Sequence, residues 1–225
     1  MTLRGNAFLA IWHDIEAEAE VEFNHWHTVE HMPERVFTPG FLAGRRLIDP
    51  SLAKHRYFTL YEGEQLETFS SDAYRERLNN PTPWAVTLQP HYRNFVRSAC
   101  LTASSTGRGT GGAMATVRMH VAPGADWRSD IASLITDLEG AHGVTAVHLG
   151  EASPETSHIV TKESELRAST GEEVFDGVIL VDGFGRREVE AAVVSLRSSL
   201  EALPSVDRAE VAVYDLAYRL DTEEE

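Results

Sequence analysis

The chain has 225 residues, of which 42% are hydrophobic and 24% are charged, and its formal net charge is −15. This composition is typical of a soluble globular protein, and the length suits one large domain or two small ones. The negative charge disfavours binding to nucleic acid or to an anionic membrane surface, because both require clustered Lys and Arg. The single cysteine, Cys100, excludes a disulfide framework and a cysteine-rich zinc site.

No apolar run approaches the roughly 20 residues that a membrane-spanning helix needs. The N-terminus also lacks the apolar core of a signal peptide. From the sequence we therefore expect a cytoplasmic protein.

The first hundred residues alternate between strand and helix patterns. Strands are predicted at residues 7–13, 41–48, 55–62 and 95–103, and helical segments at 17–31, 66–78 and 84–89. Alternation in the first strand puts Leu9, Ile11 and His13 on one face and Phe8, Ala10 and Trp12 on the other. In the third strand it puts Tyr57, Thr59 and Tyr61 together. The order β-α-β-β-α-β is the ferredoxin-like pattern.

A Gly- and Ser-rich stretch separates this half from a second one. Residues 104–112 read Ser-Ser-Thr-Gly-Arg-Gly-Thr-Gly-Gly, a composition typical of a flexible linker. The element order then repeats, with strands at 115–121, 144–150, 175–181 and 207–220, helices at 127–139 and 186–203, and a polar loop at 152–172. We predict an α+β fold of two tandem ferredoxin-like units, residues 1–103 and 114–225 joined by a linker at 104–113. Their sheets are expected to pair into a barrel within one chain.

The residues that could transfer protons or bind a metal are most concentrated between positions 22 and 35. His25, His27 and His31 fall within seven positions, together with Trp26 and Glu30. On a helix, residues three or four apart share a face, so Asn24, His27 and His31 form one polar stripe. Pro33 is expected to end the helix close by, because proline disfavours helical geometry in the residue before it.

Several short motifs around these histidines resemble a known group of proteins. They are Phe-Asn-His-Trp at 23–26, Glu-His-Met-Pro-Glu-Arg at 30–35 and Pro-Gly-Phe at 39–41, with further similarity at 57–61 and 80–84. The pattern resembles the dimeric α+β barrel proteins, in particular EthD-like and uncharacterised bacterial members. The resemblance implies a ligand cleft between sheet and helices, with His31 in the position of a histidine that often faces that cleft. Members include cofactor-independent monooxygenases, lactone isomerases, dehydratases, haem enzymes and binding proteins, so the fold does not select a reaction.

We expect proton-transfer chemistry on a planar, oxygenated small molecule, without a cofactor. A histidine can accept and release protons near neutral pH, so His31 is the candidate base, with His27 beside it. Glu30 or Asn24 would orient it, Tyr61 would donate to a developing oxyanion, and Arg46 would polarise the substrate. Either Arg45 or Arg46 faces the cleft, depending on strand register. The predicted aromatic lining consists of Trp12, Tyr57, Trp84 and Phe95.

Other roles remain open at this stage. His27 and His31, with Glu30 between them, match a short zinc-protease pattern, so a metal would be held by these two histidines. A histidine could also ligate haem, or the chain could bind a small molecule without turning it over. His31 could simply cap the helix, Trp26 belong to the core, and Glu30 pair with Arg35 or Arg46. The chain is expected to be a monomer or a homodimer.

Overall fold

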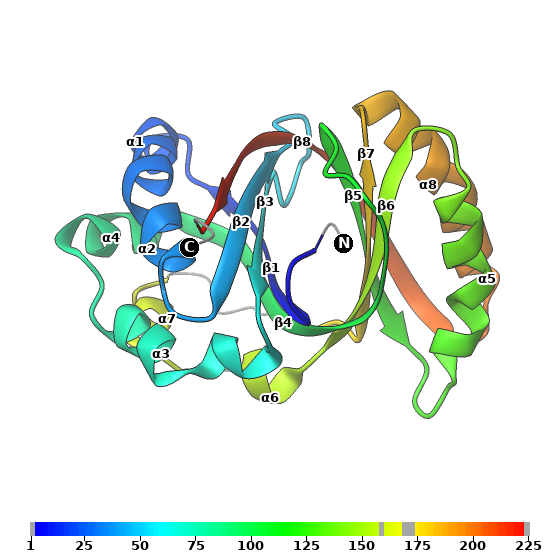
Figure 1. Ribbon diagram of the computed structural model, residues 1–225. Helices are drawn as coiled ribbons and strands as arrows, with labels where there is room; N and C mark the ends of the chain where they lie inside the picture. The colour runs from blue at the N-terminus through cyan, green and yellow to red at the C-terminus, as the bar shows by residue number, and fades with distance from the viewer. Residues whose placement is uncertain (1–2, 158–159, 168–173, 223–225) are drawn as a thin grey trace. The chain divides into compact units, whose positions relative to one another are not determined.

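The computed structural model describes residues 3–157, 160–167 and 174–222, and the chain divides into two compact units (Figure 1). Unit 1 comprises Met1–Leu3, Cys100–Ala152 and Phe175–Leu216. Unit 2 comprises Arg4–Ala99, Ser153–Val174 and Ala217–Glu225. The boundaries of the two units therefore differ from those of the predicted halves, because unit 2 also includes two segments from the second half of the sequence.

The sheet of unit 2 is centred on β3 (Tyr57–Gly63), which pairs antiparallel with β1 (Ala7–Ile15) and β2 (Phe41–Ile48). The first part of β4 (Tyr92–Gly107) lies beside β1, and the last part of β8 (Val206–Asp221) lies beside β2. Every residue of β3 is buried. One face of this sheet packs under helices, and its apolar positions form two core clusters with them.

The helical layer of unit 2 begins with α1 (Glu20–Trp26), the π-helical segment η1 (His27–His31) and α2 (Met32–Val36), which follow one another without a break. It continues with η2 (Leu66–Ser70), α3 (Asp72–Asn79), α4 (Pro83–Leu88) and η3 (Gln89–His91). The Ser71 and Thr82 side chains cap α3 and α4 by accepting backbone N–H bonds. Two short helices, α6 (Pro154–Ser157) and α7 (Lys162–Leu166), come from the second half of the sequence.

Pro33 does not end the helix near His31, as the sequence suggested. The chain widens instead into the π-helical segment, where the Met32 N–H donates to the His27 carbonyl, and helical geometry then continues to Val36. A π-turn is a common way to absorb a disturbance inside a helix, and it is frequent at functional sites. Pro33 then occupies the first turn of α2, where its missing N–H is tolerated.

Unit 1 has the second sheet, in the order β8-β5-β7-β6-β4. Its other strands are β5 (Ala113–Val121), β6 (Val144–Ala152) and β7 (Gly177–Gly183). The helices α5 (Trp127–Glu139) and α8 (Arg186–Glu201) cover one face and form a continuous apolar core with it (Figure 1).

The strands β4 and β8 take part in both sheets, so the strand order closes on itself. The fold class is therefore α+β, with two ferredoxin-like units arranged in the topology of an eight-stranded α+β barrel, as predicted. The predicted linker is shorter than expected, because residues 104–107 belong to β4 and pair with β6. Across the described residues, none of the helices combines the length and the apolar character that crossing a membrane requires.

Candidate functional site

The strand register gathers polar side chains on the helix-covered face of the unit 2 sheet. His13 lies opposite Tyr57, and Arg46 lies opposite Thr59. Tyr61 follows two positions further along β3, on the same face as Tyr57 and Thr59. Arg46, and not Arg45, therefore faces the helices. Arg45 lies on the opposite face and pairs with Glu62, with Nε 3.2 Å from Oε1.

The segment η1 presents His27 and His31 to this face. Their side chains are buried, and their ring centroids lie 5.2 Å apart. The His31 ring lies 4.4 Å from Trp26, and the His27 ring 5.5 Å from Phe23. The Nδ1 atoms of both histidines are buried without a hydrogen-bond partner. Burial, followed by the charge of Arg46 for His27 and of Arg35 for His31, lowers both pKa values well below the usual value, so both rings are neutral at pH 7.

His13 is a third buried histidine of this site, and it was not selected from the sequence. Its ring stacks on Tyr57 at 5.2 Å and meets Phe23 edge-on at 5.3 Å. Burial and then the charge of Arg46 lower the pKa of His13 to about 3. The sequence did contain a pattern that could have identified His13, because alternation in the first strand placed it on the face opposite Trp12.

Arg46 and Asn24 form one polar group. The Arg46 Nη2 donates to Asn24 Oδ1 at 2.6 Å, and the guanidinium carbon lies 5.0 Å from the ring centroids of both Phe23 and Tyr57. Asn24 therefore orients Arg46, whereas the sequence suggested that it orients His31. The Arg46 Nε is buried and has no hydrogen-bond partner.

The two strand tyrosines have different environments. The Tyr61 hydroxyl is buried without a partner, and burial raises the pKa of Tyr61 well above its usual value, so it is a neutral donor. The Tyr57 hydroxyl donates to Glu20 Oε1. Burial and then Glu20 raise the pKa of Tyr57 to about 12. Tyr61 is thus the tyrosine whose hydroxyl is available to a ligand.

Glu30 contacts neither Arg35 nor Arg46. Its Oε1 accepts from Trp26 Nε1 at 2.9 Å and from the Thr82 hydroxyl at 2.6 Å. The Trp26 ring packs on His31, so Glu30 is linked to this histidine through Trp26 rather than by direct contact. Trp26 is fully buried, in agreement with a core role.

Of the four predicted lining residues, one lies on the other face of the sheet, and Trp84 is only partly buried where it packs against the core cluster of Tyr57 and Phe95. Trp12 is on the opposite face of β1 and stacks on Phe58 at 4.8 Å. Trp84 donates through Nε1 to Glu22 Oε1 at 2.9 Å and lies beside the exposed His25, because the Thr82 cap sets the direction of α4. Tyr57 and Phe95 do lie beside the buried histidines of the site. Tyr92 lies next to them, with its ring 5.6 Å from that of Phe95.

Residues from the second half of the sequence complete the site, and the sequence did not indicate them. Glu163 of α7 forms a buried ion pair with Arg35, and the Arg167 guanidinium lies 4.1 Å from the Phe95 ring centroid. A cavity of about 40 Å³ lies here, bordered by Ile11, Tyr74, Leu78, Phe95, Arg97, Ser157, Thr161, Glu163 and Arg167. This volume suits a few water molecules at most, whereas typical ligand pockets measure roughly 300–1,000 Å³. The polar loop predicted at 152–172 thus contains α6 and α7, and its residues 158–159 and 168–172 lie outside the described part.

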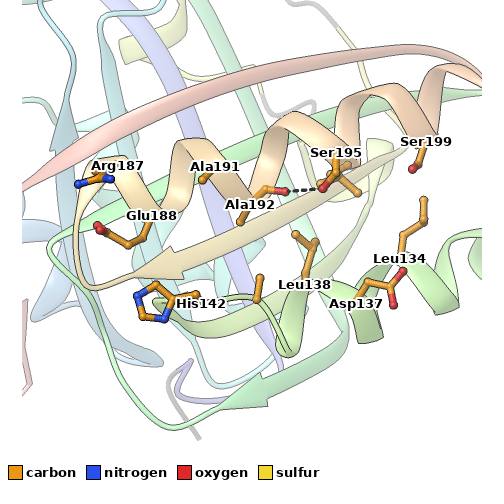
Figure 2. A pocket seen from close by; sticks show the side chains of 12 residues that line it. Leu134, Asp137, Leu138, His142, Arg187, Glu188, Ala191, Ala192, Ser195 and Ser199 are labelled. Carbon is orange, nitrogen blue, oxygen red and sulfur yellow. Dashed lines mark hydrogen bonds between the residues drawn. The ribbon is translucent and has the colours of Figure 1, made fainter.

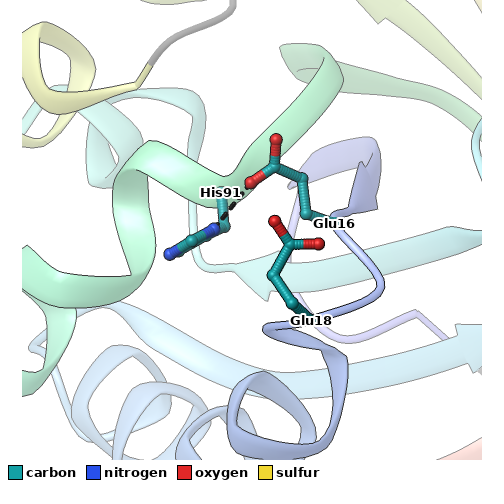
Figure 3. A group of neighbouring side chains, drawn as sticks. All are labelled: Glu16, Glu18 and His91. Carbon is teal, nitrogen blue, oxygen red and sulfur yellow. Dashed lines mark hydrogen bonds and ion pairs between the residues drawn. The ribbon is translucent and has the colours of Figure 1, made fainter.

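The zinc-protease pattern is not assembled in the structure, because Glu30 faces Trp26 and Thr82. Among the described residues, the one group with metal-ligand spacing is Glu16, Glu18 and His91 (Figure 3). The Glu16 carboxylate already binds His91 Nδ1 at 2.7 Å and forms an ion pair with Arg93. A cation there would compete with Arg93, so this group is a weak metal candidate.

A larger pocket of about 530 Å³ lies between α5 and α8 in unit 1 (Figure 2). Leu134, Leu138 and Leu196 contribute apolar surface, and Asp137, His142 and Arg187 lie at its border. None of its described lining residues has an unpartnered buried polar atom, and the Ser195 hydroxyl donates within its own helix to the Ala192 carbonyl. We therefore place the candidate site in unit 2, where several unpartnered buried polar atoms lie on one sheet face and on the helical segment that covers it, although the cavity of about 40 Å³ is lined by other residues.

Comparison with known proteins supports the fold and leaves the reaction open. No protein-family model and no curated protein sequence matches the chain. Among solved structures, a putative monooxygenase from Fusobacterium nucleatum is 11% identical with a TM-score of 0.61, covering 99% of this chain and 100% of its own. An anthrone oxidase-like protein is 10% identical with a TM-score of 0.63 (97% and 93%), and a haem-binding protein from Thermus thermophilus is 10% identical with a TM-score of 0.53 (96% and 92%). At these identities the likeness establishes a shared ferredoxin-like α+β fold.

Proposed function

We propose that the chain is an enzyme that performs acid–base chemistry on a small, planar, oxygenated molecule bound in unit 2. The observation that carries this proposal is a set of buried polar atoms, unpartnered among the described residues, on one face of the unit 2 sheet and on the helical segment that covers it: His27 Nδ1, His31 Nδ1, Thr59 Oγ1, Tyr61 Oη and Arg46 Nε. Buried polar groups nearly always have partners, so a set of five on facing elements points to a missing ligand or water. The surrounding rings of Phe23, Tyr57 and Trp26 suit a flat molecule.

In this proposal His31 is the base. Its imidazole is neutral, so Nδ1 can accept a proton from an acidic C–H or O–H of the substrate. Tyr61 donates to the oxygen on which negative charge develops, and Arg46 offsets that charge. An oxyanion beside the imidazole raises the histidine pKa again, which favours the ion pair formed by proton transfer. The chemistry needs no cofactor, as in the isomerases, lyases and monooxygenases considered from the sequence.

Access to the site requires a rearrangement of side chains, because the nearby cavity of about 40 Å³ is small and is not lined by His31, Tyr61 or Arg46. Arg167 stacks on Phe95 at its border and makes a long hydrogen bond, 3.4 Å, to Gln89 Oε1. Displacing the Arg167 side chain would widen the cavity at this border. A haem is far larger, and His27 and His31 are packed against aromatic rings, so the described residues do not fit a haem.

Solvent deuterium exchange tests the proposal without assuming the overall reaction. Anthrones, naphthols and lactones with acidic C–H groups are incubated with the protein in D₂O, and deuterium incorporation is followed by mass spectrometry. We expect catalysed exchange, reduced roughly 10²–10⁴-fold in His31→Gln, since that is the usual contribution of a general base. The matched control is His25→Gln, which changes an exposed histidine six positions earlier on the same helical stretch. If His31→Gln exchanges within about threefold of the wild type, His31 is not the base. Binding without any exchange would favour a binding protein.

A further inference from the structure

Arg46 differs from the other buried arginines in having no acidic partner among the residues that the structure describes. Four arginines are buried among the described residues: Arg35, Arg45, Arg46 and Arg118. Arg35 pairs with Glu163, Arg45 with Glu62 and Arg118 with Glu210. Arg46 is 2% exposed, yet its one hydrogen bond is to the neutral amide of Asn24. A buried charge without a counter-ion is strongly unfavourable, so this position is unusual.

The groups around Arg46 do not supply the missing negative charge. The rings of Phe23 and Tyr57 flank the guanidinium, and their faces attract the cation without neutralising it. Burial and the nearby positive charge keep His13 and His27 unprotonated, which is consistent with a local positive potential. Tyr57, Tyr61 and Tyr92 all have raised pKa values and stay neutral.

We propose that the ligand of this site is an oxyanion, and that Arg46 is the residue that selects its charge. The inference rests on the proposed function for the location of the site. The free Arg46 Nε would donate to the ligand oxygen, while the Tyr61 hydroxyl, on the neighbouring strand and the same face, donates a second hydrogen bond. Asn24 holds the guanidinium in place through Nη2 and leaves Nε for the ligand. A carboxylate, a phenolate and an enolate share this chemistry.

The ionisation state of a bound phenol tests the proposal directly. 4-Nitrophenol is neutral and nearly colourless below its pKa, and its phenolate absorbs strongly in the visible range. At such a pH we expect the full-length protein to bind the phenolate and produce its absorption band. The band should be lost in Arg46→Met and retained in Arg75→Met, which changes an exposed arginine of α3 in the same unit. Binding with no band, or an unchanged band in Arg46→Met, would overturn the proposal.

A matched pair of ligands distinguishes charge from shape already in the wild-type protein. 2-Naphthoate and 2-naphthamide have nearly the same size, and only the first is an anion. We expect the wild-type protein to bind naphthoate about tenfold to a hundredfold more tightly, the range set by a hydrogen bond to a charged group. Arg46→Lys should keep part of this preference because it keeps the charge. Circular dichroism and thermal unfolding establish that each variant folds, and equal affinities for the two ligands in the wild type refute the inference.

The two proposals fail in different ways. Arg46-dependent anion binding without deuterium exchange on any substrate supports the oxyanion site and contradicts the enzyme. Exchange on neutral substrates with no preference for anions supports the enzyme and contradicts the role of Arg46.

Discussion

At the scale of single residues, the ion pair between Arg35 and Glu163 joins positions 128 residues apart. Both side chains are almost fully buried, with exposures of 2% and 4%. Glu163→Gln would leave the Arg35 charge with only Glu34, which lies 3.3 Å away, so we expect a loss of about 3–5 kcal/mol in the free energy of unfolding. Urea unfolding measures this loss.

The solvent-exposed pair of Arg128 and Glu151 in unit 1 provides the control, since exposed pairs contribute about 0–1 kcal/mol. Glu151→Gln should therefore have little effect. The double variant Arg35→Met/Glu163→Leu should recover most of the loss, because it removes both charges. Equal small effects of Glu163→Gln and Glu151→Gln would contradict the assignment of a buried pair.

The sequence predicted part of the site because strand alternation is a local rule. It placed Tyr57 and Tyr61 on one face correctly, whereas the choice between Arg45 and Arg46 required the register. Trp12 was predicted to line the site because it is aromatic, although strand alternation already placed it on the opposite face of β1, where the structure has it. Glu163 could not be found, because no local pattern reports a contact across 128 residues.

At the scale of elements, Gly44 in β2 allows α2 to pack closely on the sheet. A Cβ added at Gly44 would lie 2.4 Å from Met32 Sδ, 2.9 Å from Val36 Cγ2 and 3.2 Å from Tyr61 Cδ1. Gly44→Ala must therefore push α2 outward, and overpacking of this kind costs about 1–3 kcal/mol. We expect a lower melting temperature and weaker ligand binding, because His31 directly precedes α2.

Gly109→Ala is the matched control for this prediction. Its added Cβ would meet Thr145 Cβ at 3.6 Å, an ordinary van der Waals contact. Thermal unfolding of both variants should show a clear loss for Gly44→Ala alone. If the two variants unfold at the same temperature, α2 is not closely packed on β2 at Gly44.

Most elements could be predicted from periodicity, because burial of one face imposes it on helices and strands alike. The helix at 127–139 and the strand at 41–48 match α5 and β2 residue for residue. Pro33 misled the prediction, since a π-turn is a rare geometry with no local sequence signature.

At the scale of the whole molecule, three of the buried histidines have lowered pKa values that make stability depend on pH. His13, His27 and His31 have native pKa values below the usual 6.5, mainly because of burial. Below about pH 6.5 the unfolded chain binds protons that the native state does not, so stability falls as the pH decreases. For His13 this loss continues down to about pH 3. Carboxylates with lowered pKa values, such as Asp14, contribute only in more acidic solution.

One pH unit below 6.5, each histidine that stays neutral in the native state lowers the free energy of unfolding by about 1.4 kcal/mol, or about 4 kcal/mol for the three. Urea unfolding between pH 7.5 and about pH 5 measures this slope, above the range in which most carboxylates titrate. His13→Phe should remove about one third of the slope, because it deletes one of the three protons while keeping a ring in contact with Tyr57. His25→Gln should leave the slope unchanged, since His25 is exposed. A wild-type stability that stays constant over this range would mean that the three rings take up protons in the native state as readily as in the unfolded chain. The site would then contain positively charged histidines beside Arg46 at acidic pH.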